Sequence, residues 1–252
     1  MRAFGRGIVV AVGLLCLWQI FIWVKQPFPF IFPGPGRVAD VWLAQYPLIL
    51  RHAGTTTVEI VGGLLAGAAL GMLSALTLAY FRTARRWLLP VLVVSQAVPV
   101  FALAPILVLW LGYGMVSKIA MATLIIFFPV TASFYDGLRR TDPGWLELAR
   151  TMNAGRWRLL RHVRLPAALP ALASGLRVAA AVAPIGAVVG EWVGSSGGLG
   201  YLMMQANARM QVDLMFAALA TLAVVALLLY YLVDALMRRL LPWSPDSAPS
   251  DD

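Results

Sequence analysis

Long apolar runs separated by short charged clusters are the feature that most constrains this chain. Hydrophobic residues make up 61% of the 252 residues and charged residues only 12%, a balance that does not suit a water-facing surface. Each run is close to the ~20 residues with which a helix crosses a bilayer. We therefore expect an all-α, polytopic membrane protein with about six transmembrane helices, and the composition excludes a soluble enzyme. The runs lie at about residues 8–24, 55–80, 88–111, 119–135, 170–193 and 214–236.

Basic residues are distributed unequally between the two sides that six crossings would define. Fourteen fall on the side of the termini and five on the other, while Arg177 lies inside the fifth run. By the positive-inside rule, both termini and the loop between the fourth and fifth runs are cytoplasmic. The same rule accounts for the net charge of +9, so we expect no nucleic-acid partner. The fourteen are Arg2, Arg6, Arg82, Arg85, Arg86, Arg139, Arg140, Arg150, Arg156, Arg158, Arg161, Arg164, Arg238 and Arg239, and the five are Lys25, Arg37, Arg51, Lys118 and Arg209.

The segments outside the six runs indicate one transmembrane domain over residues 1–252. No small-residue cleavage site follows the first run, so we expect a retained anchor rather than a signal peptide. Prolines alternate with aromatic residues in 27–36, which predicts an ordered external loop, and residues 38–50 predict a short amphipathic helix at the outer surface. Within the domain we expect a core at about 50–240, a cytoplasmic loop at about 136–169 and a disordered tail at 243–252.

The apolar runs contain few groups that could couple transport to an ion gradient or catalyse a reaction. Glu59, Glu191 and Asp234 lie near helix ends, where carboxylates can snorkel or pair. His52 and His162 flank the runs, and the sequence has neither a metal-ligand cluster nor a phosphate-binding glycine loop. We expect no catalytic residue, no metal and no cofactor in this chain, so that energy for uphill transport would come from another subunit.

The stretch between the fourth and fifth runs, residues 135–170, is too long for a simple turn. Asp142 suits an N-cap and Pro143 the first helical position, while Asn153 suits the left-handed residue that ends a helix. A second short helix is expected over 156–163, ending before Leu165. The seven arginines of this stretch are compatible with simple anchoring, and the apolar stripe with docking to a soluble partner. The stripe of the first helix consists of Trp145, Leu148, Ala149 and Met152.

Glu147-Leu148-Ala149, followed by Asn153 and then by Val163-Arg164-Leu165-Pro166, resembles the EAA loop of the ABC-importer permeases. The spacing matches, although Leu148 stands in place of an alanine and Asn153 in place of a glycine. The resemblance implies the type I ABC-importer permease fold, with this loop as the coupling helix that seats in the ATPase subunit. The residues to which it assigns this role are Trp145, Glu147, Leu148, Ala149, Met152, Asn153, Val163, Leu165 and Pro166.

The resemblance covers about residues 8–243 and is strongest to the branch that imports sulfonates, taurine, nitrate and thiamine pyrimidine precursors. Residues 135–143 and 190–201 are similar to those of hydroxymethylpyrimidine permeases. The family implies a homodimer in the bacterial inner membrane, served by an external substrate-binding protein and by two cytoplasmic ATPase subunits that bind ATP and Mg. Two alternatives are a scaffold or sensor that recruits a cytoplasmic partner without transport, and a small ion-coupled carrier.

Prolines and glycines in the runs suggest where helices bend or pack closely. Glycines at 63, 67 and 71 favour close helix contact, and residues 194–200 predict an external hairpin or re-entrant turn. Proline kinks are tolerated where a helix lines a cavity, although kinks that serve only packing are equally compatible. The residues expected along the translocation path are Ser95, Gln96, Pro99, Pro184 and Glu191.

Overall fold

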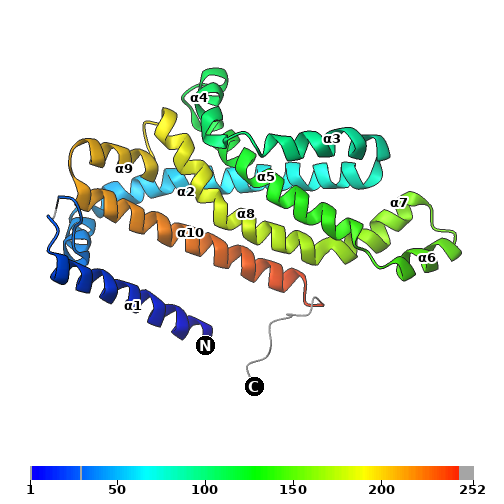
Figure 1. Cartoon of the computed structure of the whole chain (residues 1–252), viewed down its shortest axis with the longest axis horizontal. Coiled ribbons are helices and arrows are strands. Elements are labelled where there is room, and N and C mark those ends of the chain that lie inside the picture. The colour runs from blue at the N-terminus through cyan, green and yellow to red at the C-terminus, as the bar shows by residue number, and fades with distance from the viewer. Residues whose placement is uncertain (1, 29, 244–252) are drawn as a thin grey trace.

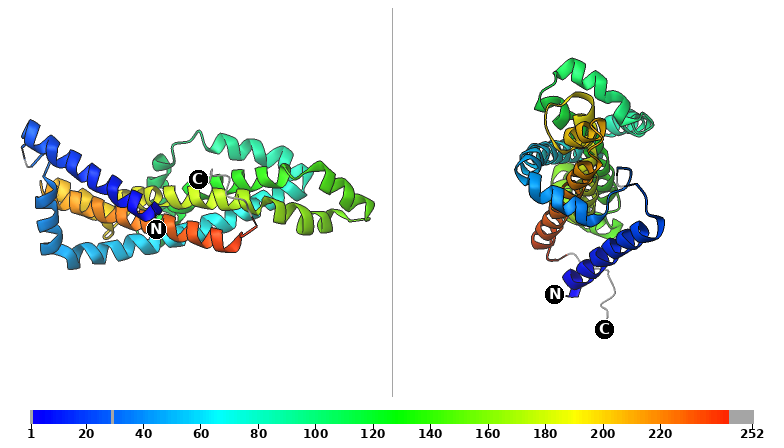
Figure 2. Two further views of the ribbon diagram at one scale, coloured as in Figure 1. Left: turned by 90° about the horizontal axis from the view of Figure 1, so that it is seen from below. Right: turned by 90° about the vertical axis from the view of Figure 1, so that its left-hand side faces the viewer.

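The computed structural model describes residues 2–28 and 30–243, and this part of the chain is helical with no strand. The helices form an elongated bundle (Figures 1 and 2). In chain order they are α1 (Arg2–Lys25), α2 (Pro35–Tyr80), α3 (Arg82–Ser95), α4 (Val100–Leu111), α5 (Met115–Arg139), α6 (Pro143–Thr151), α7 (Arg156–Leu159), the π-helix η1 (Leu160–Arg164), α8 (Leu165–Gly194), α9 (Leu199–Ala208) and α10 (Val212–Leu240).

Four helices in the described residues are long and apolar enough to cross a membrane: α2, α5, the continuous segment Arg156–Gly194, and α10. These are four of the six expected crossings. The pair α3 and α4 is a fifth candidate, and α1 contains a shorter apolar stretch, Val12–Lys25. Helices α6 and α7 lie at one end of the bundle and α9 at the other (Figure 1). We refer to these as the α6 end and the α9 end.

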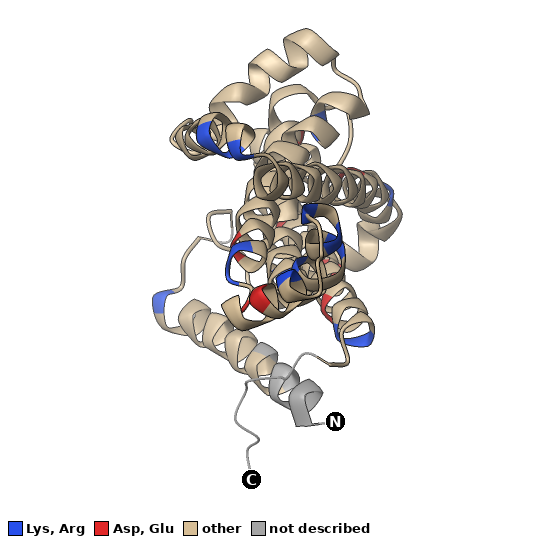
Figure 3. Cartoon of the chain, turned by 90° about the vertical axis from the view of Figure 1, so that its right-hand side faces the viewer, with Lys and Arg blue, Asp and Glu red and all other residues tan. Residues whose placement is uncertain are grey.

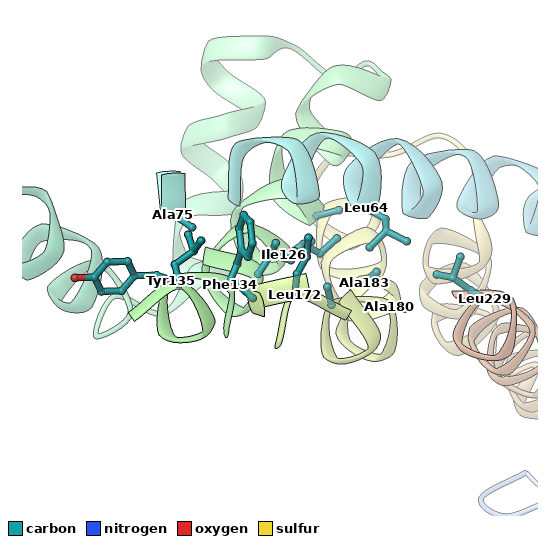
Figure 4. Close-up of a cluster of buried hydrophobic side chains, with 14 of the residues drawn as sticks. Leu64, Ala75, Ile126, Phe134, Tyr135, Leu172, Ala180, Ala183 and Leu229 are labelled. Atoms are coloured by element: carbon teal, nitrogen blue, oxygen red, sulfur yellow. The ribbon is translucent and has the colours of Figure 1, made fainter. Parts of the chain in front are cut away.

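The core of the bundle is formed where α5 packs against both α2 and α8, with α10 covering α2 and α8. Its side chains include Leu64, Ile126, Phe134 and Leu172 (Figure 4). Small residues allow the close approach: a Cβ added at Gly67 would lie 2.7 Å from Ile126 Cγ2. The expected role of the glycine stripe in close packing is therefore confirmed.

The third expected crossing, residues 88–111, was predicted as one helix, and this is wrong. Helices α3 and α4 are separated by residues 96–99 and bent by 101°. Pro99 is the N-cap of α4, with φ −60° and ψ 113°. A proline lacks the N–H that would continue α3, and it disfavours helical backbone in the preceding residue. The chain therefore starts a new helix in another direction.

The N-terminal part differs in one respect from expectation. The loop before α2 is ordered as predicted: Trp18 Nε1 donates to the carbonyl of Pro33 at 3.1 Å, and its ring contacts Phe32. The short helix expected over 38–50 is present as the first part of α2, but its bounds differ: it ends at a kink at Gln45, where φ is −120° and ψ 20°, and a long helix then continues through Pro47 to Tyr80. Pro47 occupies the first turn after that kink, where a missing N–H costs no hydrogen bond. Of the expected tail, 244–252 lies outside the described residues.

The second loop helix was expected to end before Leu165, and this is also wrong. Helix α7 continues through η1 into α8, giving one helical segment of 39 residues. The backbone N–H of Leu165 donates to the carbonyl of Leu160, five residues earlier. A wider π turn at this point relieves the clash that Pro166 would otherwise make with the carbonyl four residues before it.

Candidate functional site

Helix α6 is closed at both ends by the residues that the sequence indicated. Asp142 Oδ1 accepts a hydrogen bond of 2.7 Å from the backbone N–H of Gly144, which confirms the N-cap. Asn153 is left-handed, with φ 58°. The N–H of Asn153 donates to Arg150 and that of Ala154 to Ala149, the pair of bonds that defines a Schellman C-cap. The short helix is therefore a well-defined rigid element.

One face of α6 presents large apolar side chains to the surroundings. Trp145, Leu148 and Met152 are 58%, 62% and 75% exposed. They line an apolar groove of about 460 Å³ between α6 and the start of α8. Exposed apolar surface of this kind is typical of a protein–protein contact. The other residues lining the groove are Ala149, His162, Val163, Pro166, Ala167 and Trp243.

The structure thus brings together six of the nine residues expected to contact an ATPase. Glu147 is exposed on α6 and does not line the groove. Asn153 forms the turn after the helix, and Leu165 lines a neighbouring apolar groove against the end of α2. Several positions at this end of the bundle are basic (Figure 3).

A polar cavity of about 490 Å³ lies near the α9 end of the bundle. It is formed by three segments that are distant in sequence: the middle of α2, the α4–α5 turn with the start of α5, and the α8–α9 turn. The backbone N–H of Gly198 donates to His52 Nδ1 at 3.0 Å, which fixes the α8–α9 turn against α2. The lining residues are Arg51, His52, Thr55, Glu59, Tyr113, Gly114, Met115, Lys118, Ser195, Ser196, Gly197 and Tyr201.

Glu59 is the unusual group in this cavity. Its side chain is fully buried, and in the described residues its oxygens accept no hydrogen bond from an N–H or hydroxyl group; the carboxyl of Glu191 is the neighbour with which it can share a proton. Glu191 and Lys118 are both close enough to Glu59 to interact electrostatically. The Lys118 ammonium is itself held by the carbonyls of Tyr113 and Gly114, each at 3.2 Å. A buried carboxyl without a donor is costly, so this site lacks a hydrogen-bonding group that a ligand could supply.

Glu191 has a different environment, because its carboxylate holds the start of α9. It accepts hydrogen bonds from the Thr56 hydroxyl and from the backbone N–H groups of Gly200 and Tyr201. Gly198, at φ 105°, leaves no room for a side chain beside this carboxylate. Of the two outcomes expected for Glu59 and Glu191, snorkelling or pairing, snorkelling does not occur: both side chains are buried and interact with each other.

Asp234, the third carboxylate noted in the sequence, is paired as expected. Its oxygens contact Arg177 at 2.6 Å and Arg238 at 2.9 Å. Arg177 comes from the middle of α8, so this contact links α8 to α10. The pair lies toward the opposite end from Glu59 and takes no part in the cavity.

The structure does not bring together the five residues expected along the translocation path. Ser95, Gln96 and Pro99 are exposed at the break between α3 and α4, whereas Pro184 and Glu191 are buried in α8. None of the five lines the cavity at the α9 end. Lys118 and Thr56 were not predicted as residues of this site, the first because it was assigned to an external loop. The run of three threonines at 55–57 was a signal that could have drawn attention to this part of α2.

Comparison with known proteins decides the family. The model of the family described as binding-protein-dependent transport system inner membrane component matches residues 67–243. The chain belongs to this family of ABC-importer permeases. The permease is a subunit of a transport system and not an enzyme, because ATP hydrolysis in this family is carried out by a separate ATPase. As a member, it is a multi-pass inner-membrane protein that works with an ATPase and a substrate-binding protein.

Relatives and solved structures agree with this assignment. The permease is 56% identical over 239 residues to a probable ABC transporter permease protein of Haemophilus influenzae, covering 95% of this chain and 97% of the relative. It is 39% identical to the riboflavin transport system permease protein RibX of Chloroflexus aurantiacus, with 93% and 88% covered. It is 36% identical to the formylaminopyrimidine transport permease protein ThiX of Halalkalibacterium halodurans, with 91% and 92% covered.

The fold is also that of a solved importer. An inward-facing structure of the MetNI methionine ABC transporter contains a chain that superposes with a TM-score of 0.69 at 20% identity, covering 78% of the permease and 98% of that chain. The expected type I ABC-importer permease fold is therefore confirmed.

Proposed function

We propose that the permease forms, as a homodimer, the translocation path for a small nitrogen heterocycle delivered by an external binding protein. The solute class that we favour is a thiamine pyrimidine precursor such as hydroxymethylpyrimidine. The observation that carries this choice is the buried carboxyl of Glu59 in the polar cavity, which receives no hydrogen bond from an N–H or hydroxyl group of the described residues. The relatives named for the transport of formylaminopyrimidine and of riboflavin, both of which are nitrogen heterocycles with N–H donors, support the same class.

The chemistry of the cavity suits an aminopyrimidine better than a sulfonate. An amino group beside a ring nitrogen can donate N–H to a carboxyl oxygen, which is what Glu59 lacks. The rings of His52 and Tyr201, with centroids 6.1 Å apart, offer flat surfaces to a planar solute. Charge does not separate the two solute classes, because Arg51 and Lys118 line the same cavity as Glu59; the choice rests on the N–H donors and the planar ring.

The α6 helix is proposed to be the coupling helix. Its apolar face would seat in a groove of the cytoplasmic ATPase, which binds ATP and Mg, and both termini of the permease would lie on that side. Closure of the ATPase pair on ATP would then move the two coupling helices together and open the cavity outward. Ser95, Gln96 and Pro99, at the bend between α3 and α4, are proposed as the gate where the two protomers meet.

Charge reversal at Glu147 tests the coupling role. Glu147→Arg should abolish copurification of the ATPase and ATP-dependent uptake in proteoliposomes, while membrane insertion stays normal. The matched control is Asp40→Arg, which reverses an exposed carboxylate of α2 far from α6 in sequence. Normal ATPase binding and uptake in the Glu147 variant would refute the proposed docking role.

Substitution of Glu59 tests the solute class. With the cognate binding protein and ATPase reconstituted, uptake of radiolabelled hydroxymethylpyrimidine should exceed that of taurine or an alkanesulfonate. Glu59→Met, which removes the acceptor but keeps the volume, should lower this uptake about tenfold or more, as expected for loss of a buried hydrogen bond. ATPase copurification should not change. Equal uptake by Glu59→Met and wild type would contradict the role of Glu59, and preferred uptake of a sulfonate would contradict the solute class.

A further inference from the structure

Five arginines surround a cavity of about 380 Å³ at the α6 end of the bundle. They come from α3, α6, α7 and η1, segments that the fold brings together. Among residues 2–28 and 30–243, no acidic residue lines the cavity. The five are Arg82, Arg85, Arg150, Arg156 and Arg164.

These arginines have no carboxylate partner in the part of the chain that the structure describes. The ion pairs found there involve Arg37, Arg177 and Arg238, each facing an aspartate. Arg164 Nε is buried and has no hydrogen-bond partner. Five guanidinium groups around one cavity repel each other unless an anion lies between them. The planar donor pattern of guanidinium matches phosphate oxygens, which accept two parallel N–H bonds from one arginine.

An apolar groove of about 520 Å³ adjoins the basic cavity. The two share Tyr80 and Leu160, so the polar and apolar spaces lie side by side. Tyr80 and Trp157 pack edge to face at the boundary, with centroids 6.1 Å apart, in the manner of aromatic residues at a membrane interface. The remaining groove residues are Leu73, Leu76, Thr77, Phe81, Arg161 and Leu165.

We propose that this pair of cavities binds an anionic phospholipid of the inner leaflet. The phosphate of the headgroup lies among the five arginines, and an acyl chain follows the apolar groove along the last turns of α2. A free phosphate would satisfy the arginines but leave the groove empty, which is why the amphipathic ligand is favoured. The bound lipid would connect the start of α3 to α6 and α7, and so hold the loop against the bundle.

Lipid binding to the purified full-length chain tests the proposal. In detergent containing phosphatidylglycerol or phosphatidylcholine, native mass spectrometry should show one tightly retained phosphatidylglycerol and no retained phosphatidylcholine. The triple variant Arg85→Gln, Arg156→Gln, Arg164→Gln should weaken phosphatidylglycerol binding about tenfold or more. The matched control is Arg139→Gln, Arg140→Gln, Arg239→Gln. It removes the same amount of charge from residues that do not line the cavity, and it should bind phosphatidylglycerol normally.

Three further measurements distinguish the lipid from other possible occupants of the basic cavity. The variant Arg85→Lys, Arg156→Lys, Arg164→Lys keeps the positive charge and should keep most of the binding, so that loss in the glutamine variant is not attributed to misfolding. Inorganic phosphate at millimolar concentration should not displace the lipid, whereas displacement would show a simple phosphate site and overturn the proposal. Loss of the retained lipid when the ATPase assembles would identify acidic side chains of that subunit as the true occupant. Equal phosphatidylglycerol binding by the two glutamine variants would also overturn the proposal.

Discussion

The Thr56 hydroxyl donates a hydrogen bond of 2.6 Å to Glu191 Oε1, although 135 residues separate the two. The same hydroxyl oxygen accepts a bond of 2.7 Å from the backbone N–H of Leu199. One threonine therefore joins three helices, α2, α8 and α9, beside the polar cavity. The position of the cavity wall depends on this junction, because the α8–α9 turn contributes three of its lining residues.

Replacing Thr56 tests the junction. Thr56→Val keeps the shape but leaves the Leu199 N–H and one Glu191 oxygen without partners, which should cost about 1–3 kcal/mol of unfolding free energy. The thermal unfolding temperature of the purified permease should fall accordingly. Thr57→Val is the matched control, because the Thr57 hydroxyl bonds only to the Ala53 carbonyl of its own helix. A fall of the same size in both variants would argue against the junction.

Substitution by alanine should change the stability of the permease in opposite directions at two glycines of α2. A Cβ at Gly67 would meet Ile126 Cγ2 at 2.7 Å, whereas a Cβ at Gly54 has nothing within 4 Å. Gly67→Ala should therefore destabilise the contact of α2 with α5 by about 1–3 kcal/mol. Gly54→Ala should be neutral or stabilising by up to about 1 kcal/mol, because alanine favours the helix. Unfolding in detergent measures both, and similar effects would contradict the packing described for α2.

The left-handed residue that ends α6 should tolerate only certain substitutions. Asn153→Gly should keep or slightly improve the C-cap, and Asn153→Val should weaken it by about 1–2 kcal/mol, because a β-branched side chain disfavours φ 58°. Hydrogen exchange of the α6 amides and the affinity for the ATPase report the effect. Slower exchange in the valine variant than in wild type would be incompatible with the observed cap.

Asp234 is paired with two arginines, so substitutions of Asp234 and of Arg177 should lower the unfolding free energy by different amounts. Asp234→Leu leaves Arg177 of α8 without a partner, whereas Arg177→Leu leaves Asp234 still paired with Arg238. We expect the aspartate variant to lose about 1–3 kcal/mol more of unfolding free energy than the arginine variant. The loss is smaller than for a fully buried ion pair, because Arg177 is partly exposed to solvent. The double variant should recover part of the loss, as a double-mutant cycle would measure. A larger loss in Arg177→Leu would reverse this interpretation.

Local features of the sequence predicted a large part of this fold. The four long helices follow from apolar runs, and the ends of α6 follow from Asp142 and Asn153, because caps depend on residues that are neighbours in the chain. A bend in residues 88–111 was indicated by the prolines there, but its angle of 101° could not be predicted. The angle depends on contacts between segments that are distant in the sequence. The π turn before Pro166 was missed for the same reason.

The polar cavity could not be assembled from the sequence, because its groups are tertiary neighbours. Glu59 and Lys118 lie on different helices, and each is compatible with a helix end when considered alone. Lys118 is buried where the start of α5 packs against Gly190 of α8, and Glu191 is enclosed where α9 folds back over α8. The turn at 194–200 was predicted, but the helix that follows it and its contacts with α2 were not. The coupling loop was easier to recognise, because its residues are contiguous and its motif resembles a known one.

The absence of any break between Arg156 and Gly194 makes this segment sensitive to length. An inserted residue would advance the far end by about 1.5 Å and turn it by about 100°. Glu191 would then point away from Thr56, even if the insertion lay near Arg164 at the opposite face of the membrane. Substitutions in the middle of the segment should therefore be tolerated far more often than insertions or deletions there.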